Sequence, residues 1–287
     1  MTQARQYNFV KCELCGADQT RVVYEIEGKS SRVLNVLVNG HEVKLDKTAL
    51  VVQCQRCGLV YVNPRIHLEN GMLPYSNEAE EAYFQNTYRQ RAYASQRLVE
   101  RLPAWVRPGP LRLLDIGCGD GVLLEACQQA GIDFVGSEVS PALIEQLRAK
   151  FGSEQIVAAE KIADFPAQSF DVVVLINVIE HLEYPGALVH EAYRLLKPGG
   201  IFLVHAPNLA GLPARLHGKD WHQIQPLVHL YYFTPASLKQ LIQKAGFKPL
   251  GRFSLLSPSP FKRAAQLLSD RLNLYLDNGL GLVSRRE

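Results

Sequence analysis

The sequence predicts an α/β protein in which a Rossmann-like, doubly wound, mostly parallel seven-stranded sheet follows a small β-rich N-terminal module. From Leu111 onward, apolar strand patterns alternate with amphipathic helix patterns, an order that is typical of a parallel sheet covered on both faces. A glycine-rich turn follows the first of these strands, and two C-x2-C pairs enclose the N-terminal β runs. The 287 residues suffice for one large core and one smaller module.

Three segments are expected along the chain. They are the module at residues 1–64, a helical linker at 65–110, and the main domain at 111–287 with a helical insertion near 258–277. The module contains the short β-like runs RVVYEI, RVLNVLV, ALVVQC and GLVYV, with turn signals such as Asn39-Gly40 between them. In the linker, apolar and aromatic residues recur at helical spacing from Tyr75 until Leu102-Pro103, where the helix is expected to stop.

The main domain is expected to alternate strands and helices in a regular order. The predicted strands are LRLLDIG, IDFVGSE, QIVA, FDVVVLI, IFLVHAP, FKPLGRFSLL and GLVSRR. The predicted helices are GVLLEACQQA, PALIEQLRAK, ALVHEAYRLL and PASLKQLIQKAG. The third helix is expected to close at the turn Lys197-Pro198-Gly199-Gly200.

Composition excludes few functions. The net charge of +3 and the pI near 8.5 make the surface mildly basic, but no clustered Lys/Arg stripe of the kind that nucleic-acid binding requires is present in the sequence. The start MTQARQYNFV does not read as a signal peptide, and no apolar run approaches the length of a membrane span. We therefore expect a cytoplasmic protein, whose six cysteines are thiols, metal ligands or core residues rather than disulfides.

The segment LLDIGCGDG, residues 113–121, predicts a ligand-binding turn. Its glycines allow positive φ angles and let backbone N–H groups approach a ligand. The glycine spacing differs from that of a dinucleotide fingerprint, and the GK[ST] ending of a phosphate loop is missing. Glu138 follows the next strand, where a carboxylate can accept both hydroxyls of a ribose. The alternative is a tight turn without a ligand, beside a solvated carboxylate.

The motifs LLDIGCGDG, Glu138, FDVVVLINVIEHL and LLKPGG, taken in this order, resemble those of the class I S-adenosylmethionine-dependent methyltransferases. The resemblance spans Leu111 to Phe247. It implies S-adenosylmethionine as cofactor, a methionine end at the glycine loop, a ribose at Glu138 and an adenine beside Ala159. The implied cofactor-binding residues are Asp115, Gly117, Cys118, Gly119, Glu138, Val139, Ala159, Glu160, Asn177 and Tyr83. Tyr83 lies in a helix that closes over the cofactor in similar enzymes, although aromatic residues at helical spacing also serve packing.

Histidines are the candidate catalytic residues. Methyl transfer requires both reactants to be positioned and, for a hydroxyl acceptor, a proton to be removed, which an imidazole can do near neutral pH. The candidates are His229, followed by His181 and His222. The alternative for each is a structural or loop histidine.

A second divalent cation is a further alternative at this site. Some relatives, including small-RNA 2′-O-methyltransferases and ubiquinone-pathway O-methyltransferases, use a Glu-x-x-Glu-His pattern and a later histidine to hold one. This chain has Asn177 in place of the first Glu, but Glu180, His181 and His229 remain as ligands.

The four cysteines Cys12, Cys15, Cys54 and Cys57 form two C-x2-C knuckles, each followed by a glycine. Four thiolates at this spacing are typical of a structural tetrahedral zinc site, which leaves no open position for catalysis. Redox dithiols are the alternative, but no strand–helix context of a thioredoxin motif is present in the sequence. Together with GLVYVNPR, the knuckles resemble the N-terminal modules of bacterial sugar and secondary-metabolite methyltransferases.

These features favour an enzyme that methylates a small-molecule, sugar or glycolipid acceptor, most readily at oxygen. One alternative is an RNA methyltransferase that uses the zinc module to bind RNA, and another is a noncatalytic binding protein. The amphipathic segment FKRAAQLLSDRLNLYL, residues 261–276, is expected to act as a helical lid or to make a peripheral membrane contact. The sequence leaves the oligomeric state open.

Overall fold

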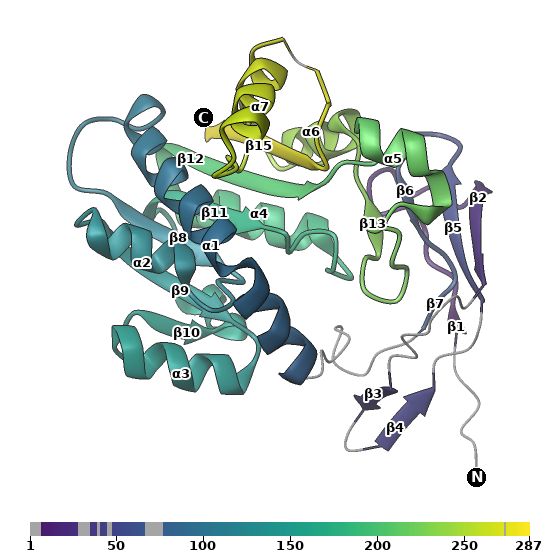
Figure 1. The fold of residues 1–287 in the computed structure, drawn as a ribbon, viewed down its shortest axis with the longest axis horizontal. Coiled ribbons are helices and arrows are strands. Elements are labelled where there is room, and N and C mark those ends of the chain that lie inside the picture. The colour runs from purple at the N-terminus through teal and green to yellow at the C-terminus, as the bar shows by residue number, and fades with distance from the viewer. Residues whose placement is uncertain (1–6, 28–34, 39–40, 45–47, 67–76, 273) are drawn as a thin grey trace.

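The computed structural model describes residues 7–27, 35–38, 41–44, 48–66, 77–272 and 274–287. Its main sheet has seven strands in the order β10-β9-β8-β11-β12-β15-β14 (Figure 1). The strands are β8 (Arg112–Ile116), β9 (Asp133–Glu138), β10 (Ile156–Ala158), β11 (Phe170–Ile176), β12 (Leu196–Pro207), β14 (Phe247–Phe253) and β15 (Gly279–Arg286). Only β15 runs antiparallel to its neighbours β12 and β14. The predicted Rossmann-like, mostly parallel sheet is confirmed.

Helices cover both faces of this sheet. The helices α1 (Asn77–Arg101), α2 (Val122–Gln129) and α3 (Pro141–Phe151) pack on one face, and α4 (Pro185–Leu195) and α6 (Pro235–Lys244) pack on the other. Successive side chains of β11 point to opposite faces of the sheet. Val172 and Val174 pack in the core under α1, α2 and α3, and Val173 and Leu175 pack in the core under α4 and α6. Two-sided burial explains why β11 is an uninterrupted apolar run.

Local sequence signals set several helix starts. Ser140 caps α3 by accepting from the backbone N–H of Leu143, and Thr234 forms a capping box with Ser237 at α6. One boundary differs from expectation, because β12 begins at Leu196 and includes the predicted closing turn after α4. Leu196 pairs with Phe170 of β11, and the next pair is Val172 with Ile201. The extra residues of β12 between these two pairs form an irregularity that includes Gly199, whose φ is 82°.

The N-terminal module is an antiparallel sheet, as predicted, but it has a strand from the main domain. Its order is β13-β6-β5-β2, with β2 (Thr20–Glu27), β5 (Thr48–Cys54), β6 (Val60–Val62) and β13 (Tyr231–Tyr232). Two small pairs accompany it, β1 (Tyr7–Asn8) with β7 (Arg65–Ile66), and β3 (Asn35–Val38) with β4 (His41–Lys44). Trp221 and Tyr232 pack with Val51, Val60 and Val62 in one core. The module and the main domain are therefore joined by shared packing.

The remaining elements are α5 (Leu212–His217), α7 (Pro260–Leu272) and the short 3-10 helices η1 (Leu102–Ala104), η2 (Ala159–Asp164) and η3 (Gly218–Asp220). The helix α7 lies within residues 258–277, where the sequence predicts a helical insertion, and α1 ends within two residues of the predicted stop. Asn39-Gly40 and Tyr75 lie outside the described residues. No helix in the described part of the chain has both the length and the apolar character that a bilayer crossing requires.

Gly136 in β9 is expected to tolerate no side chain. A Cβ at this position would lie 2.6 Å from Cδ1 of Leu124 and 2.9 Å from Sγ of Cys118, both of which are buried. Gly136→Ala should therefore lower the free energy of unfolding by about 1–3 kcal/mol through overpacking. Gly251→Ala in β14, where a Cβ would meet open space, is the matched control. Equal denaturant midpoints for the two variants would contradict the packing described for β9.

Candidate functional site

The glycine loop after β8 has the backbone geometry that its sequence predicts. Gly117, Gly119 and Gly121 have φ angles of 72°, 56° and 81°, and α2 begins directly after Gly121. The N–H groups of Gly117 and Cys118 both donate to the Ser137 carbonyl, at 2.8 and 3.0 Å, which ties the loop to β9. A Cβ on Gly117 would lie 2.5 Å from Cγ2 of Val178. Both the left-handed backbone and this close approach favour glycine.

Glu138 faces this loop from the end of β9. Its Oε2 accepts from the Gly119 N–H at 2.9 Å, and its Oε1 accepts from the N–H groups of Val139 and Ser140 at 2.7 and 3.1 Å. Asp115 lies at the end of the neighbouring strand, where burial and the charge of Glu138 raise its pKa to about 7. Two buried carboxylates at adjacent strand ends provide acceptors for ribose hydroxyls and a negative potential for a cationic ligand.

The helix α1 lies over the loop. The Arg91 guanidinium binds the Asp120 carboxylate through two contacts of 2.5 and 2.7 Å, and its Nη2 also donates to the Phe84 carbonyl. The Phe84 ring lies against Gly119, because an added Cβ there would be 3.1 Å from it. Tyr83, the residue predicted from this helix, is half-exposed beside Phe84. Sequence reasoning missed Phe84 and Arg91, although their spacing of seven places them on one helix face.

The other predicted cofactor residues follow neighbouring strand ends at the same edge of the sheet. Cys118 is buried in the glycine loop, and Val139 is exposed after β9. Ala159 and Glu160 begin η2 after β10, with Glu160 exposed. Asn177 follows β11 with a φ of 54°. The parallel strands bring these residues to one edge, while their contacts with a cofactor remain predictions.

Asn177 has a partner that the sequence did not indicate. Its Oδ1 lies 2.9 Å from Nδ1 of His205 in β12, and its N–H donates to the His205 carbonyl at 2.9 Å. Burial lowers the pKa of His205 to about 4, so the ring is neutral. A pairing of two side chains from adjacent strands depends on sheet order, which a local motif does not reveal.

Beyond β11, the structure brings Glu180, His181 and His229 together. One ligand atom from each lies within 4.8 Å of the others, and the two imidazole rings meet edge to face at 4.8 Å between centroids. Nδ1 of His181 is 2.9 Å from the Val228 carbonyl, and Nδ1 of His229 is 2.8 Å from the Gln223 carbonyl. Backbone carbonyls thus orient both rings, as they do for histidines that ligate metals. His222 lies outside this cluster, exposed beside Trp221.

The electrostatics of this cluster suit a cation. Glu180 is buried, and its Oε2 has no hydrogen-bond partner among the described residues. Burial raises the pKa of Glu180 to about 8, although its own backbone N–H opposes this shift. Burial and the neighbouring His181 lower the pKa of His229 to about 3. Burial also lowers the pKa of His181, which the Val228 and Asn177 carbonyls oppose. A carboxylate and two neutral imidazoles are a donor set that a divalent metal ion accepts.

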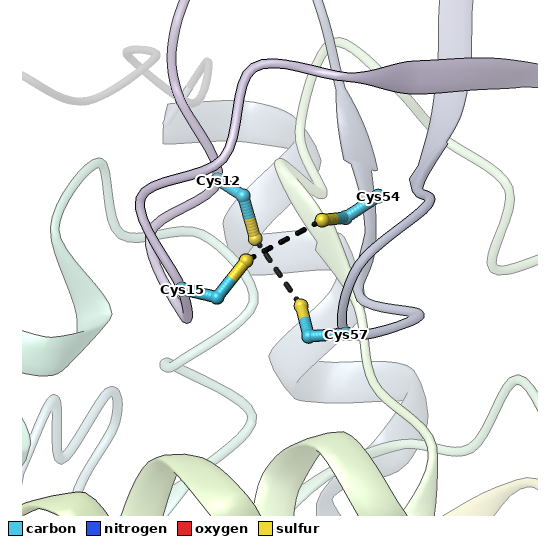
Figure 2. A group of neighbouring side chains, drawn as sticks. All are labelled: Cys12, Cys15, Cys54 and Cys57. Carbon is cyan, nitrogen blue, oxygen red and sulfur yellow. Dashed lines mark hydrogen bonds between the residues drawn. The ribbon is translucent and has the colours of Figure 1, made fainter.

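The four predicted cysteine ligands also converge (Figure 2). Sγ of Cys12 lies 3.4 Å from Sγ of Cys57, and Sγ of Cys15 lies 3.5 Å from Sγ of Cys54. Tetrahedral zinc with ordinary Zn–S bonds separates its sulfurs by about 3.8 Å, so the site needs only a small expansion to hold the ion.

The knuckle backbones also suit zinc. Each turn is closed by a glycine N–H that donates to the carbonyl of the first cysteine, and both glycines have positive φ. Burial acts to raise the pKa of the Cys54 thiol, but the N–H groups of Cys57 and Arg56 outweigh it and lower that pKa to about 7. The knuckle bearing Leu14 is docked on α6, because Nζ of Lys244 donates to the Leu14 carbonyl.

We expect purified protein to contain one zinc ion per chain, and Cys54→Ser to lose it. Because four cysteines close the site, removing one thiolate should weaken binding and lower the thermal midpoint of the whole chain. Elemental analysis with thermal unfolding checks this, and Cys127→Ser, a buried cysteine outside the cluster, is the control for losing a core thiol. Zinc-free protein of unchanged stability would contradict the assignment.

Residues 86–250, more than half of the chain, match the sequence family described as a methyltransferase domain. The ubiquinone biosynthesis O-methyltransferase of Cereibacter sphaeroides is 32% identical over 164 residues, which cover 50% of this chain and 62% of that protein. The enzyme with the same name in Idiomarina loihiensis is 29% identical over 151 residues, covering 48% and 62%. The chain thus spans less than two thirds of the length of these relatives.

Solved structures support the fold. A SAM-dependent methyltransferase from Archaeoglobus fulgidus aligns with a TM-score of 0.51 at 22% identity, over 71% of this chain and 99% of that one. The 1,6-didemethyltoxoflavin-N1-methyltransferase of Burkholderia thailandensis aligns with a TM-score of 0.50 at 15% identity, over 81% and 96%. The chain therefore belongs to the methyltransferase-domain family and has the fold of S-adenosylmethionine-dependent methyltransferases.

Proposed function

We propose that this chain transfers a methyl group from S-adenosylmethionine to an oxygen atom of a small-molecule, sugar or glycolipid acceptor held at Glu180, His181 and His229. The observation that carries the proposal is the position of this cluster directly after β11, at the sheet edge that also presents the glycine loop. Oxygen is supported by the donor set, which suits a hydroxyl, and by the name of the O-methyltransferase relatives.

The described residues fit the cofactor. Buried Asp115 and Glu138 supply negative charge, and S-adenosylmethionine is positively charged at its sulfonium and amino groups. Glu138 would accept the ribose hydroxyls, and the glycine loop would hold the methionine end under Phe84 and α1. When bound, the cofactor supplies a methyl group on a good leaving group. The chain's part is to hold this methyl in line with the acceptor and to exclude water.

The acceptor oxygen forms its bond to carbon as the bond from carbon to sulfur breaks, and the hydroxyl proton must leave. Since Nδ1 of His229 donates its proton to the Gln223 carbonyl, the lone pair lies on Nε2. That nitrogen can take the proton or bind a divalent cation, which would lower the pKa of the acceptor hydroxyl. Because burial lowers the pKa of His229 to about 3, the ring is a weak base, and this favours the cation. The partnerless Oε2 of Glu180 favours the cation, and Glu180, His181 and His229 would hold it.

The N-terminal module binds the segment that carries His229 through backbone hydrogen bonds. Val62 of β6 donates its N–H to the Leu230 carbonyl at 2.9 Å, and β13 pairs with β6 immediately afterwards. On its other side the same segment binds the Glu180 carbonyl through the N–H groups of Leu230 and Tyr231. His229 thus lies in a segment held on both sides by backbone hydrogen bonds. We assign the module a positioning role.

Cofactor affinity should increase with pH. Asp115, with a pKa of about 7, is protonated below that value, and the cationic cofactor favours its ionised form. Calorimetry should show one S-adenosylmethionine per chain, with affinity that rises up to about tenfold per pH unit below pH 7 and levels off above it. Asp115→Asn should bind more weakly and flatten the profile. A well-folded protein that does not bind the cofactor would overturn the proposed function.

His229→Ala should lower turnover by about 100-fold or more. The assay follows S-adenosylhomocysteine formation and a product with one added methyl group, across a panel of phenolic and sugar hydroxyl acceptors. Cofactor affinity should be unchanged, because His229 contacts His181 and the Gln223 carbonyl, which belong to the proposed acceptor side. His222→Ala, at the exposed neighbouring histidine, is the matched control.

Metal dependence separates the two roles of His229. If the cluster holds a cation, a chelator that leaves the cysteine-bound zinc in place abolishes turnover, and Mg²⁺ or Mn²⁺ restores it. If turnover resists the chelator while His229→Ala is inactive, His229 is the general base. Normal turnover by His229→Ala would reject both roles.

A further inference from the structure

The amphipathic helix α7 turns its apolar face to solvent and its polar face to the protein, the reverse of the usual arrangement. Phe261 is 87% exposed and Leu268 is 51% exposed, and Leu272 is exposed as well. With Ala264 and Ala265, these residues form an apolar stripe at helical spacing, which points to solvent. Figure 1 shows α7 at the periphery of the molecule, beside β15.

The polar face of α7 binds the protein. Arg263 donates to the hydroxyl of Tyr93 in α1. The side chain of Gln266 accepts from the Ser257 N–H at 2.8 Å and donates to the Leu255 carbonyl at 3.1 Å. Further along the same face, Asp270 accepts from the Ser254 hydroxyl at 2.9 Å. These hydrogen bonds fix the rotation of the helix, so the apolar stripe is directed outward by specific contacts.

This orientation distinguishes between the roles expected for the helix. A lid would turn the apolar stripe toward the site that it closes, and that would leave Gln266 and Asp270 without these partners. An outward stripe that covers about three turns, exposed from the described part of the chain, is typical of a surface that docks on an apolar partner.

Charge identifies the partner. At 100° per residue, Lys262 and Arg271 flank the apolar stripe on its two sides, and both are exposed. The one carboxylate of the helix, Asp270, lies on the inner face. A second copy of the chain would bring like charges together across a two-fold axis, whereas an anionic lipid surface would accept the leucines and neutralise the flanking cations.

We propose that α7 is an interfacial helix that docks this chain on an anionic membrane surface. Phe261, Leu268 and Leu272 enter the boundary between headgroups and acyl chains, and Lys262 and Arg271 contact the lipid headgroups. Since Arg263 ties α7 to α1, docking brings the lipid surface next to the helix that covers the glycine loop. The proposal does not depend on the identity of the acceptor.

Flotation of the full chain with lipid vesicles tests the proposal. The protein should float with vesicles of phosphatidylcholine and phosphatidylglycerol, and only weakly with phosphatidylcholine alone. Leu268→Ser should reduce the partition coefficient by about tenfold. Lys262→Gln combined with Arg271→Gln should do so to a similar extent and should remove the salt dependence.

Val22→Ser is the matched control, since Val22 is also 51% exposed but lies in β2 of the N-terminal sheet. It should bind vesicles like the parent chain. Circular dichroism should show that all variants keep their fold, because each replaced side chain is at the surface. Unchanged flotation of Leu268→Ser, or equal binding to neutral vesicles, would overturn the proposal. A dimer in light scattering that Leu268→Ser dissociates would instead assign the stripe to contact between copies.

Discussion

The loop that carries His229 depends on a short backbone pairing between segments far apart in the sequence. The strand β13, only two residues long, adds to the sheet of the N-terminal module next to β6. Arg65 strengthens the junction, because its guanidinium lies 4.5 Å from the Tyr231 ring and donates to the Glu183 carbonyl, which the Tyr231 hydroxyl also reaches. Without this sheet edge, the loop that carries His229 would have backbone partners only on the side of Glu180.

The two cysteine knuckles contribute to the same arrangement. They fix the ends of the segment between Cys12 and Cys57, and Cys12, Cys54 and Leu59 belong to the hydrophobic cluster that contains Tyr231 and the core of α6. A closed four-cysteine site does not perform chemistry itself. The four cysteines lie next to β6, the strand with which β13 of the main domain pairs, so their contribution to the loop of His229 is structural.

Local sequence patterns predicted most of the fold and part of the site. The alternation of buried strands and amphipathic helices follows from short patterns, and the structure confirms it. The glycine loop, Glu138 and the four cysteines were also found from short motifs; the structure places Glu138 against the loop and brings the cysteines together, while their ligands stay predictions. The pairing of β13 with β6, the cover that Phe84 and Arg91 provide, and the contact of Asn177 with His205 depend on distant segments. The sequence also could not predict that the apolar face of α7 points to solvent, because periodicity defines an apolar stripe but not the direction in which it faces.

The pairing of β13 with β6 has a consequence for the order in which the chain folds. During synthesis the cysteines and strands up to Val62 emerge first, yet the edge of their sheet stays open until Tyr231 and Tyr232 have followed. Contacts between residues so far apart in the sequence form late, because bringing them together costs the conformational entropy of the long chain segment between them. The N-terminal unit is thus completed by the domain that it later supports, so a ribosome-bound chain that ends before Tyr231 would carry an unpaired edge strand exposed to aggregation.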